Sequence, residues 1–199
     1  VSTTIFVVLD VMIGAVTFTG SLVASGKLMG MISGKPIIFP GTRILTVVLA
    51  VVAVAGTAIL VLGAAGTLTL DGTVSVLILG LILASALVFG VTMVLPIGGA
   101  DMPVVISLLN AFTGTAVAMA GFVLNSPVLI ISGALVGASG GILTKLMADA
   151  MNRSILNIMI GGFGGGEGTS ATGAGGPGGS VRSIGADDVA IQLAYASNV

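Results

Sequence analysis

The sequence predicts an all-α membrane protein, a bundle of about five transmembrane helices with short hairpin loops. After it we expect a Gly-rich linker and the truncated start of an α/β domain. Three observations support this. First, 56% of the 199 residues are hydrophobic and only 7% are charged, whereas soluble domains carry about 25% charged residues. Second, apolar runs of membrane-spanning length recur along the chain. Third, the composition changes to Gly, Ser and Thr after residue 160.

The apolar runs set the predicted helices. Each is about 20–24 residues long, or roughly 30–36 Å as a helix, which matches a hydrocarbon core of ~30 Å. The separators between them are short and carry turn residues, as in "GTLTLDGT", "PIGGADMP" and "NSP". Such tight hairpins predict antiparallel neighbours. The predicted spans are 3–26, 44–65, 74–95, 104–124 and 128–148.

The basic residues orient this bundle. Five spans in alternation place the first loop, the third loop and the C-terminal tail on one side of the membrane. The basic residues of the loops and helix ends fall on that same side, and the positive-inside rule makes it cytoplasmic. These residues are Lys27, Lys35, Arg43, Lys145 and Arg153.

The chain beyond the bundle divides in two. Residues 1–160 form the predicted transmembrane domain, and 161–179 are Gly-rich and predict a flexible linker. Residues 180–199 read as a short strand followed by an amphipathic helix with an acidic N-terminus. We therefore expect the opening of a soluble α/β domain there. Because Val1 lies inside an apolar stretch without a charged n-region, we expect a segment of a longer protein and no signal peptide.

Composition excludes several function classes for this chain. It has no cysteine and no histidine, which removes thiolate chemistry and the commonest general base and metal ligand. Its seven acidic residues are scattered, so we expect no metal site. A net charge of −1 gives no footprint for nucleic acid. The string "GGFGGG" lacks the Lys-Ser/Thr ending of a phosphate loop, so a linker is the better interpretation.

The fourth span carries a stripe of small residues with an amide at its cytoplasmic end. Asn110, Gly114, Ala118 and Gly121 follow at spacings of four, four and three. One hypothesis is helix–helix packing, in which an interhelical Asn hydrogen bond contributes about 1 kcal/mol. The other is an ion or proton route lined by an intramembrane polar group. Asn cannot titrate, so it could only orient a water or a partner.

The fifth span repeats GxxxG through Gly133, Gly137 and Gly141, which predicts close helix packing. Ser132 and Ser139 lie seven residues apart on another face. They extend a polar lining, or they bond only to their own helix backbone.

Three charged residues near the ends of the spans leave alternatives open. Asp101 precedes a helix N-terminus, which favours helix capping. Arg153 is a topology anchor by position, and a pair with Asp101 is the alternative. Asp10 lies about two turns into the first span without an obvious partner, which favours an interfacial position over a proton relay.

Four strings, in order, point to a family. They are "IGAVTFTGSLVASGKL", "IGGADMPVVISLLN", "GALVGASGGILTKLMADAMNRS" and "GGFG". Together they closely resemble the membrane domain of the beta subunit of proton-translocating NAD(P)+ transhydrogenase. The tail "SVRSIGADDVAIQLAYASNV" is similar to the start of that family's NADP(H)-binding domain.

The resemblance implies a proton pump that couples hydride transfer between NADH and NADP+ to proton translocation. It places Asn110, Ser139 and Ser132 in the proton pathway, and Asp101 and Arg153 at the cytoplasmic coupling face. It also implies that the titrating histidine and all nucleotide-binding and catalytic residues lie outside this chain. Where many relatives have a Ser-Ser pair, this chain has an alanine before its serine at positions 138–139.

The resemblance further implies the cofactors NADP(H) and NAD(H), an alpha subunit with the NAD(H) site, the rest of the beta subunit, and a homodimer of the alpha–beta unit. The implied location is the bacterial or mitochondrial inner membrane, with the tail cytoplasmic or in the matrix. The alternative from another class is a secondary transporter or channel subunit with a Gly/Ser/Thr-lined solute path. That alternative predicts an internal repeat and a discontinuous helix.

Overall fold

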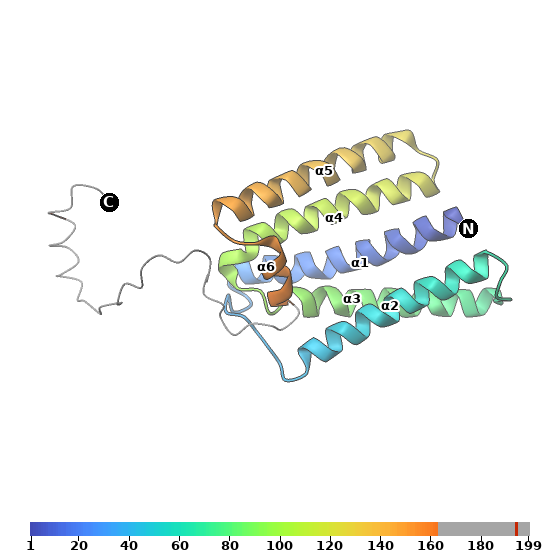
Figure 1. The fold of residues 1–199 in the computed structure, drawn as a ribbon, viewed down its shortest axis with the longest axis horizontal. Coiled ribbons are helices and arrows are strands. Elements are labelled where there is room, and N and C mark those ends of the chain that lie inside the picture. Colours follow the sequence, from blue (N-terminus) through green and yellow to red (C-terminus); the bar gives the residue numbers. More distant parts are fainter. Residues whose placement is uncertain (163–193, 195–199) are drawn as a thin grey trace. The chain divides into compact units, whose positions relative to one another are not determined.

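The computed structural model describes residues 1–162 and residue 194. The described residues are helical apart from their turns, and five helices are long and apolar enough to cross a membrane. The fold-class prediction of a five-helix bundle is confirmed, and the span bounds agree to about two residues at each end. The elements are α1 (Ser2–Leu28), α2 (Thr42–Ala64), α3 (Gly72–Val94), η1 (Gly99–Asp101), α4 (Met102–Val123), α5 (Pro127–Ala150) and α6 (Ile155–Gly162) (Figure 1).

One helix was not predicted from the sequence, and two predicted segments lie largely outside the described residues. The short helix α6 follows α5 directly and was not expected. Apart from residue 194, the predicted domain start at 180–199 lies outside the described residues, as does the predicted linker at 161–179 apart from its first two residues. Each of the five spanning helices is continuous, so the described part of the chain holds no discontinuous helix of the kind the transporter alternative predicts.

The helices pack as neighbours in the order α5–α4–α1–α3–α2 (Figure 1). Thus α1 lies between α4 and α3, and it makes little contact with α2, its neighbour in sequence. A close approach explains this position. A Cβ at Gly90 of α3 would collide with the carbonyl oxygen of Val16 in α1. The Thr19 hydroxyl also donates across this contact to the Leu87 carbonyl oxygen, at 2.8 Å.

The seam between α4 and α5 depends on glycine. A Cβ at Gly133 would collide with the Ala118 backbone nitrogen, and one at Gly114 with the Gly137 nitrogen. Gly140 also belongs to the seam, because a Cβ there would lie 2.7 Å from the Ala111 nitrogen. Small residues therefore let the two backbones touch.

One glycine of the predicted stripe lies elsewhere. A Cβ at Gly141 would have no neighbour within 4 Å in the described chain, so Gly140 takes its place against α4. A strict four-residue spacing turns Gly141 by about 80° away from Gly133, whereas Gly140 is turned by only about 20°. For that reason the last glycine of the Gly133–Gly137–Gly141 stripe does not face α4.

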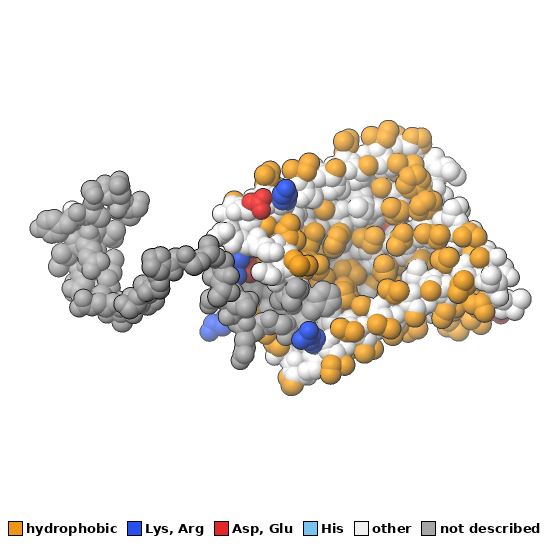
Figure 2. Space-filling view, viewed as in Figure 1, with side chains coloured by type: hydrophobic (Ala, Val, Ile, Leu, Met, Phe, Trp, Pro, Cys, Tyr) orange, Lys and Arg blue, Asp and Glu red, His pale blue; other side chains and the backbone are white. Residues whose placement is uncertain are grey.

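Three segments distant in sequence meet at one end of the bundle, which we call the loop end: residues 29–41, 95–101 and 151–154. The Ile37 amide donates to the Leu95 carbonyl oxygen at 3.2 Å, and the Gly99 amide donates to the Gly34 carbonyl oxygen at 2.8 Å. Figure 2 shows Lys and Arg side chains at this end. The α2–α3 turn and the α4–α5 turn, residues 65–71 and 124–126, form the opposite end, which we call the turn end.

The larger of two buried apolar clusters lies towards the loop end. It includes Val94 at the end of α3, Met102 and Val105 at the start of α4, and Ile158 of α6. Since α6 buries Ile158 here, the helix that the sequence did not predict completes the core beneath the loops. The smaller cluster, around Val8, Leu60 and Ile82, lies towards the turn end.

Candidate functional site: a coupling loop and a polar helix face

The structure brings Asp101 and Arg153 together at the loop end. Arg153 Nε lies 3.4 Å from Asp101 Oδ1, and the side chains are 46% and 17% exposed respectively. The Asp101 Oδ1 atom is buried and has no hydrogen bond among the described residues. The contact is therefore an ion pair without hydrogen-bond geometry. Asp101 occupies the N-cap position of α4 as the sequence predicted, but its side chain makes no capping hydrogen bond, which leaves the helix dipole as the favourable interaction there.

The local sequence explains how Arg153 reaches this position. Asn152 follows the end of α5 with φ +52, a left-handed conformation that asparagine tolerates. Its amide donates to the Asp149 carbonyl oxygen at 3.0 Å, and the Arg153 amide donates to the Ala148 carbonyl oxygen at 2.9 Å. This pair of bonds is a Schellman motif, which reverses the chain at a helix end. The string "MNRS" thus turns Arg153 back towards Asp101.

Asp101 is held by the short helix η1, between α3 and α4. Its amide donates to the Gly98 carbonyl oxygen at 3.1 Å. Pro103 stands in the first turn of α4, where its missing N–H costs nothing. Consequently the acid sits at the fixed start of the helix that also carries Asn110.

Asn110 lies on an exposed face of α4. Its side chain has no hydrogen bond within the described residues. Thr113 and Val117, at i+3 and i+7, share this face. Both line a groove of about 440 Å³ that also contains Thr17 and Ser21 of α1. Asn110 therefore lies beside this groove, one turn nearer the loop end.

The helix-five serines extend the same side. Leu129 of α5 lines the groove, and Ser132 and Ser139 follow it at i+3 and i+10. Both serines are exposed, and each donates to its own helix, to the Leu129 carbonyl oxygen at 3.3 Å and the Val136 carbonyl oxygen at 3.0 Å. They do not bond to Asn110. Ser139 and Asn110 lie at a similar depth along the bundle. Gly140, which follows Ser139, closely approaches Ala111, which follows Asn110.

Asp10 gives this side a titratable group that the sequence analysis assigned to the interface. The residue is half-buried and lines the groove together with Thr17 and Thr113. No ion pair to Asp10 is present among residues 1–162. We call Asp10, Thr113, Asn110, Ser132 and Ser139 with the groove between them the polar face.

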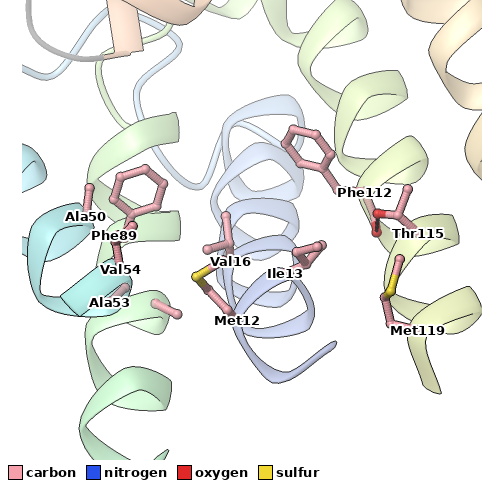
Figure 3. A pocket seen from close by; sticks show the side chains of 11 residues that line it. Met12, Ile13, Val16, Ala50, Ala53, Val54, Phe89, Phe112, Thr115 and Met119 are labelled. Atoms are coloured by element: carbon pink, nitrogen blue, oxygen red, sulfur yellow. Dashed lines mark hydrogen bonds between the residues drawn. The ribbon is translucent and has the colours of Figure 1, made fainter. Parts of the chain in front are cut away.

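The other side of the same helices is apolar. A pocket of about 550 Å³ lies between α1, α2, α3 and α4, lined by residues such as Met12, Phe112 and Met119. Figure 3 shows the lining side chains, with those of α2 and α3 on one side of α1 and those of α4 on the other. Its one hydroxyl, on Thr115, donates to the Phe112 carbonyl oxygen at 2.7 Å. This pocket has no group to conduct a proton, and hydrocarbon suits it better than water.

One residue of the loop end was misjudged at the sequence level. Lys27, counted among the basic residues that orient the bundle, lies in the last turn of α1 and is only 5% exposed. Its ammonium donates to the carbonyl oxygens of Leu95 and Ile97. Lysines near helix ends ordinarily reach out to water, so nothing in the sequence signals this burial. In the described part of the chain, no three His, Cys, Asp or Glu residues cluster to hold a metal.

Comparison with known proteins identifies the family of this chain. The family model of the NAD(P) transhydrogenase beta subunit matches residues 1–199. The chain is 44% identical over 191 residues to NAD(P) transhydrogenase subunit beta of Rhodospirillum rubrum, covering 96% of this chain and 39% of that protein. The protein of the same name from the R. rubrum strain ATCC 11170 matches equally. The chain thus spans about two fifths of the length of these relatives. On this similarity, the chain belongs to the NAD(P) transhydrogenase beta subunit family.

Proposed function

We propose that this chain is the membrane part of a proton pump that couples hydride transfer between NADH and NADP+ to proton translocation. The complete assembly is an oxidoreductase with NADP(H) and NAD(H) as cofactors. Its partners are an alpha subunit, the rest of the beta subunit and a second copy of the alpha–beta unit. The family to which the chain belongs and its five spanning helices support this proposal.

The observation that carries the mechanism is the geometry of α4. Asp101 stands at its start, paired with Arg153, and Asn110 lies nine residues further on, about 14 Å along the axis. The α4–α5 seam is too tight for one helix to slide freely past the other. A displacement of the Asp101–Arg153 pair therefore moves α4 and α5 together, and the polar face on these two helices moves with them.

In this mechanism the loop end is the coupling surface and the polar face is part of the proton route. Asn110 cannot carry a proton, but its amide can orient a water next to the groove. The titrating carrier on the route is supplied from outside this chain. NADP(H) binding favours one arrangement of the loop end, and protonation favours one arrangement of the polar face. Linkage then makes each event change the affinity of the other.

The basic residues at the loop end support an orientation. We propose that this end faces the bacterial cytoplasm or the mitochondrial matrix, in the inner membrane, because loops rich in Lys and Arg stay on that side. The C-terminal tail is then on the same side of the membrane.

The test of this function uses the complete enzyme in sealed vesicles. Hydride transfer from NADPH to an NAD+ analogue is followed by absorbance, and lumenal pH is followed with a trapped dye. We expect a pH gradient that appears only with both nucleotides, and an uncoupler should collapse it while speeding hydride transfer. Hydride transfer without a gradient, and without response to the uncoupler, would contradict the proposal. Protein-free vesicles serve as the control.

A further inference from the structure

Among the described residues of the loop end, Lys27 carries a buried ammonium that the mechanism above does not use. It stands in the last turn of α1, 5% exposed, and Nζ donates to the Ile97 carbonyl oxygen at 2.7 Å and to the Leu95 carbonyl oxygen. Lysine is almost never fully buried unless it is paired. The ion pair present among residues 1–162 joins Arg153 to Asp101, so Lys27 is balanced by carbonyl dipoles and not by a carboxylate.

Those carbonyls belong to the end of α3. Leu95 is the C-cap of this helix, where the last carbonyls lack helical partners and the dipole is negative. A cation there replaces the missing donors. Lys27 thereby ties the end of α1 to the end of α3, on both sides of the buried Pro96.

The tied segment leads directly to the coupling pair. Ile97 precedes Asp101 by four residues, and the chain between them is held by two further backbone bonds, Gly99 to Gly34 at 2.8 Å and Asp101 to Gly98 at 3.1 Å. Ile97 also packs in the buried cluster that contains Val23 and Ala24 of α1, and Lys27 adds hydrogen bonds from α1 to the loop backbone. Without Lys27, the loop keeps its backbone bonds and this apolar contact but loses its hydrogen bonds to α1.

We propose that Lys27 is a positioning residue of the coupling surface: it holds the loop of residues 95–101 so that Asp101 meets Arg153 and presents a preformed surface to the NADP(H)-binding domain. The proposal rests on the proposed function. Lys27 touches no nucleotide and carries no proton. It acts through Asp101, because a preformed surface avoids the ordering cost that a loose loop pays on docking.

The direct test is loop order in the complete enzyme. A spin label is placed at an Ala100→Cys position, which is exposed, and its mobility is read by electron paramagnetic resonance. Lys27→Met keeps the apolar stem and removes all donors, so the label should become mobile. Lys27→Arg keeps donors and charge and should restore immobility. Lys35→Met removes an exposed lysine of the neighbouring loop and should change nothing.

The functional readout separates positioning from general damage. Lys27→Met should weaken NADPH binding about fivefold or more, within the usual range of coupling effects, without lowering the rate at saturating nucleotide to the same extent. In an Asp101→Asn background it should add little, because both changes act on one element. An unchanged label mobility in Lys27→Met, or fully additive effects with Asp101→Asn, overturns the proposal.

Two further outcomes are decisive. If Lys27→Met does not assemble, Lys27→Gln takes its place, since it still reaches one carbonyl. Intermediate label mobility supports the proposal and wild-type mobility overturns it. If the unsubstituted enzyme neither pumps protons nor transfers hydride, the proposed function fails, and label mobility still decides the role of Lys27.

Discussion

The two ends of the bundle are built differently. At the turn end each turn is closed by bonds to its own preceding helix, as when the Thr67 amide donates to the Leu62 carbonyl oxygen at 3.2 Å and the Ser126 amide to the Gly121 carbonyl oxygen at 2.9 Å. At the loop end the bonds join segments far apart in sequence, through Lys27 and the Asp101–Arg153 pair. The larger apolar cluster lies beneath them.

This difference shows where long-range geometry matters to the molecule. A hairpin needs only local closure, which the short turns 65–71 and 124–126 supply. At the loop end, hydrogen bonds and an ion pair instead join segments that are far apart in the sequence. Such linked segments suit a coupling surface, so substitutions at the two ends should differ in their effects.

The largest effect is expected in the α4–α5 seam, which joins Arg153 to the rest of the bundle. In Gly133→Leu the new side chain starts in collision with the Ala118 backbone, so the helices must separate. The cost should exceed the ~1–3 kcal/mol typical of overpacking. We expect loss of assembled enzyme and a lower unfolding temperature. The matched control is Gly141→Leu, which meets nothing within 4 Å. Equal stability of the two variants would refute the seam.

A smaller effect is expected from two carboxylates that precede helices at opposite ends. Asp101 is paired with Arg153 at the loop end, and Asp71 is exposed at the start of α3. Asp101→Asn removes the charge of the pair and should change NADP(H) affinity about five- to tenfold. Asp71→Asn should leave this affinity unchanged. Equilibrium binding of NADPH to the complete enzyme measures both. The contrast between the ends is lost if Asp71→Asn shifts affinity as much.

The smallest effect on activity is expected from two cysteine substitutions that only show which side of the membrane each end of the bundle faces. Ser33 and Thr69 are exposed at the loop end and the turn end respectively. Ser33→Cys and Thr69→Cys should both leave activity intact. An impermeant thiol reagent added to intact cells should label the cysteine at 69 and spare the one at 33. Labelling in the reverse pattern would invert the proposed orientation.

Much of the fold could be predicted because its signals are local. Length and hydropathy fix the five spans, and the helix ends carry left-handed residues where the sequence has Gly or Asn, at Gly30, Gly66, Asn125 and Asn152. The sequence allowed a contact between Asp101 and Arg153 as one alternative, because both residues are predicted on the same side of the membrane. The role of these residues in coupling stays a prediction.

The remainder depends on packing that no local pattern encodes. The position of α1 between α4 and α3 depends on Gly90 meeting Val16. The choice of Gly140 over Gly141 depends on about 100° of helix rotation. Lys27 is buried only because the end of α3 offers it carbonyls. Asn110, Ser132 and Ser139 share one face, yet their part in proton movement also stays a prediction.

The central claim is that the polar face conducts the proton, and Asn110→Leu tests it most directly. Leucine removes both donor and acceptor of the amide without adding charge. The control is Thr115→Val on the apolar side of the same helix, where the hydroxyl serves only its own backbone.

Proton pumping, proton-coupled hydride transfer and nucleotide exchange that bypasses the proton step are measured for both variants in the same vesicles. In Asn110→Leu we expect pumping and coupled hydride transfer to fall together by about tenfold or more, the loss of roughly one strong polar interaction, while the bypass reaction survives. Thr115→Val should behave as wild type. Full pumping by Asn110→Leu would contradict the account and leave the amide with a packing role alone.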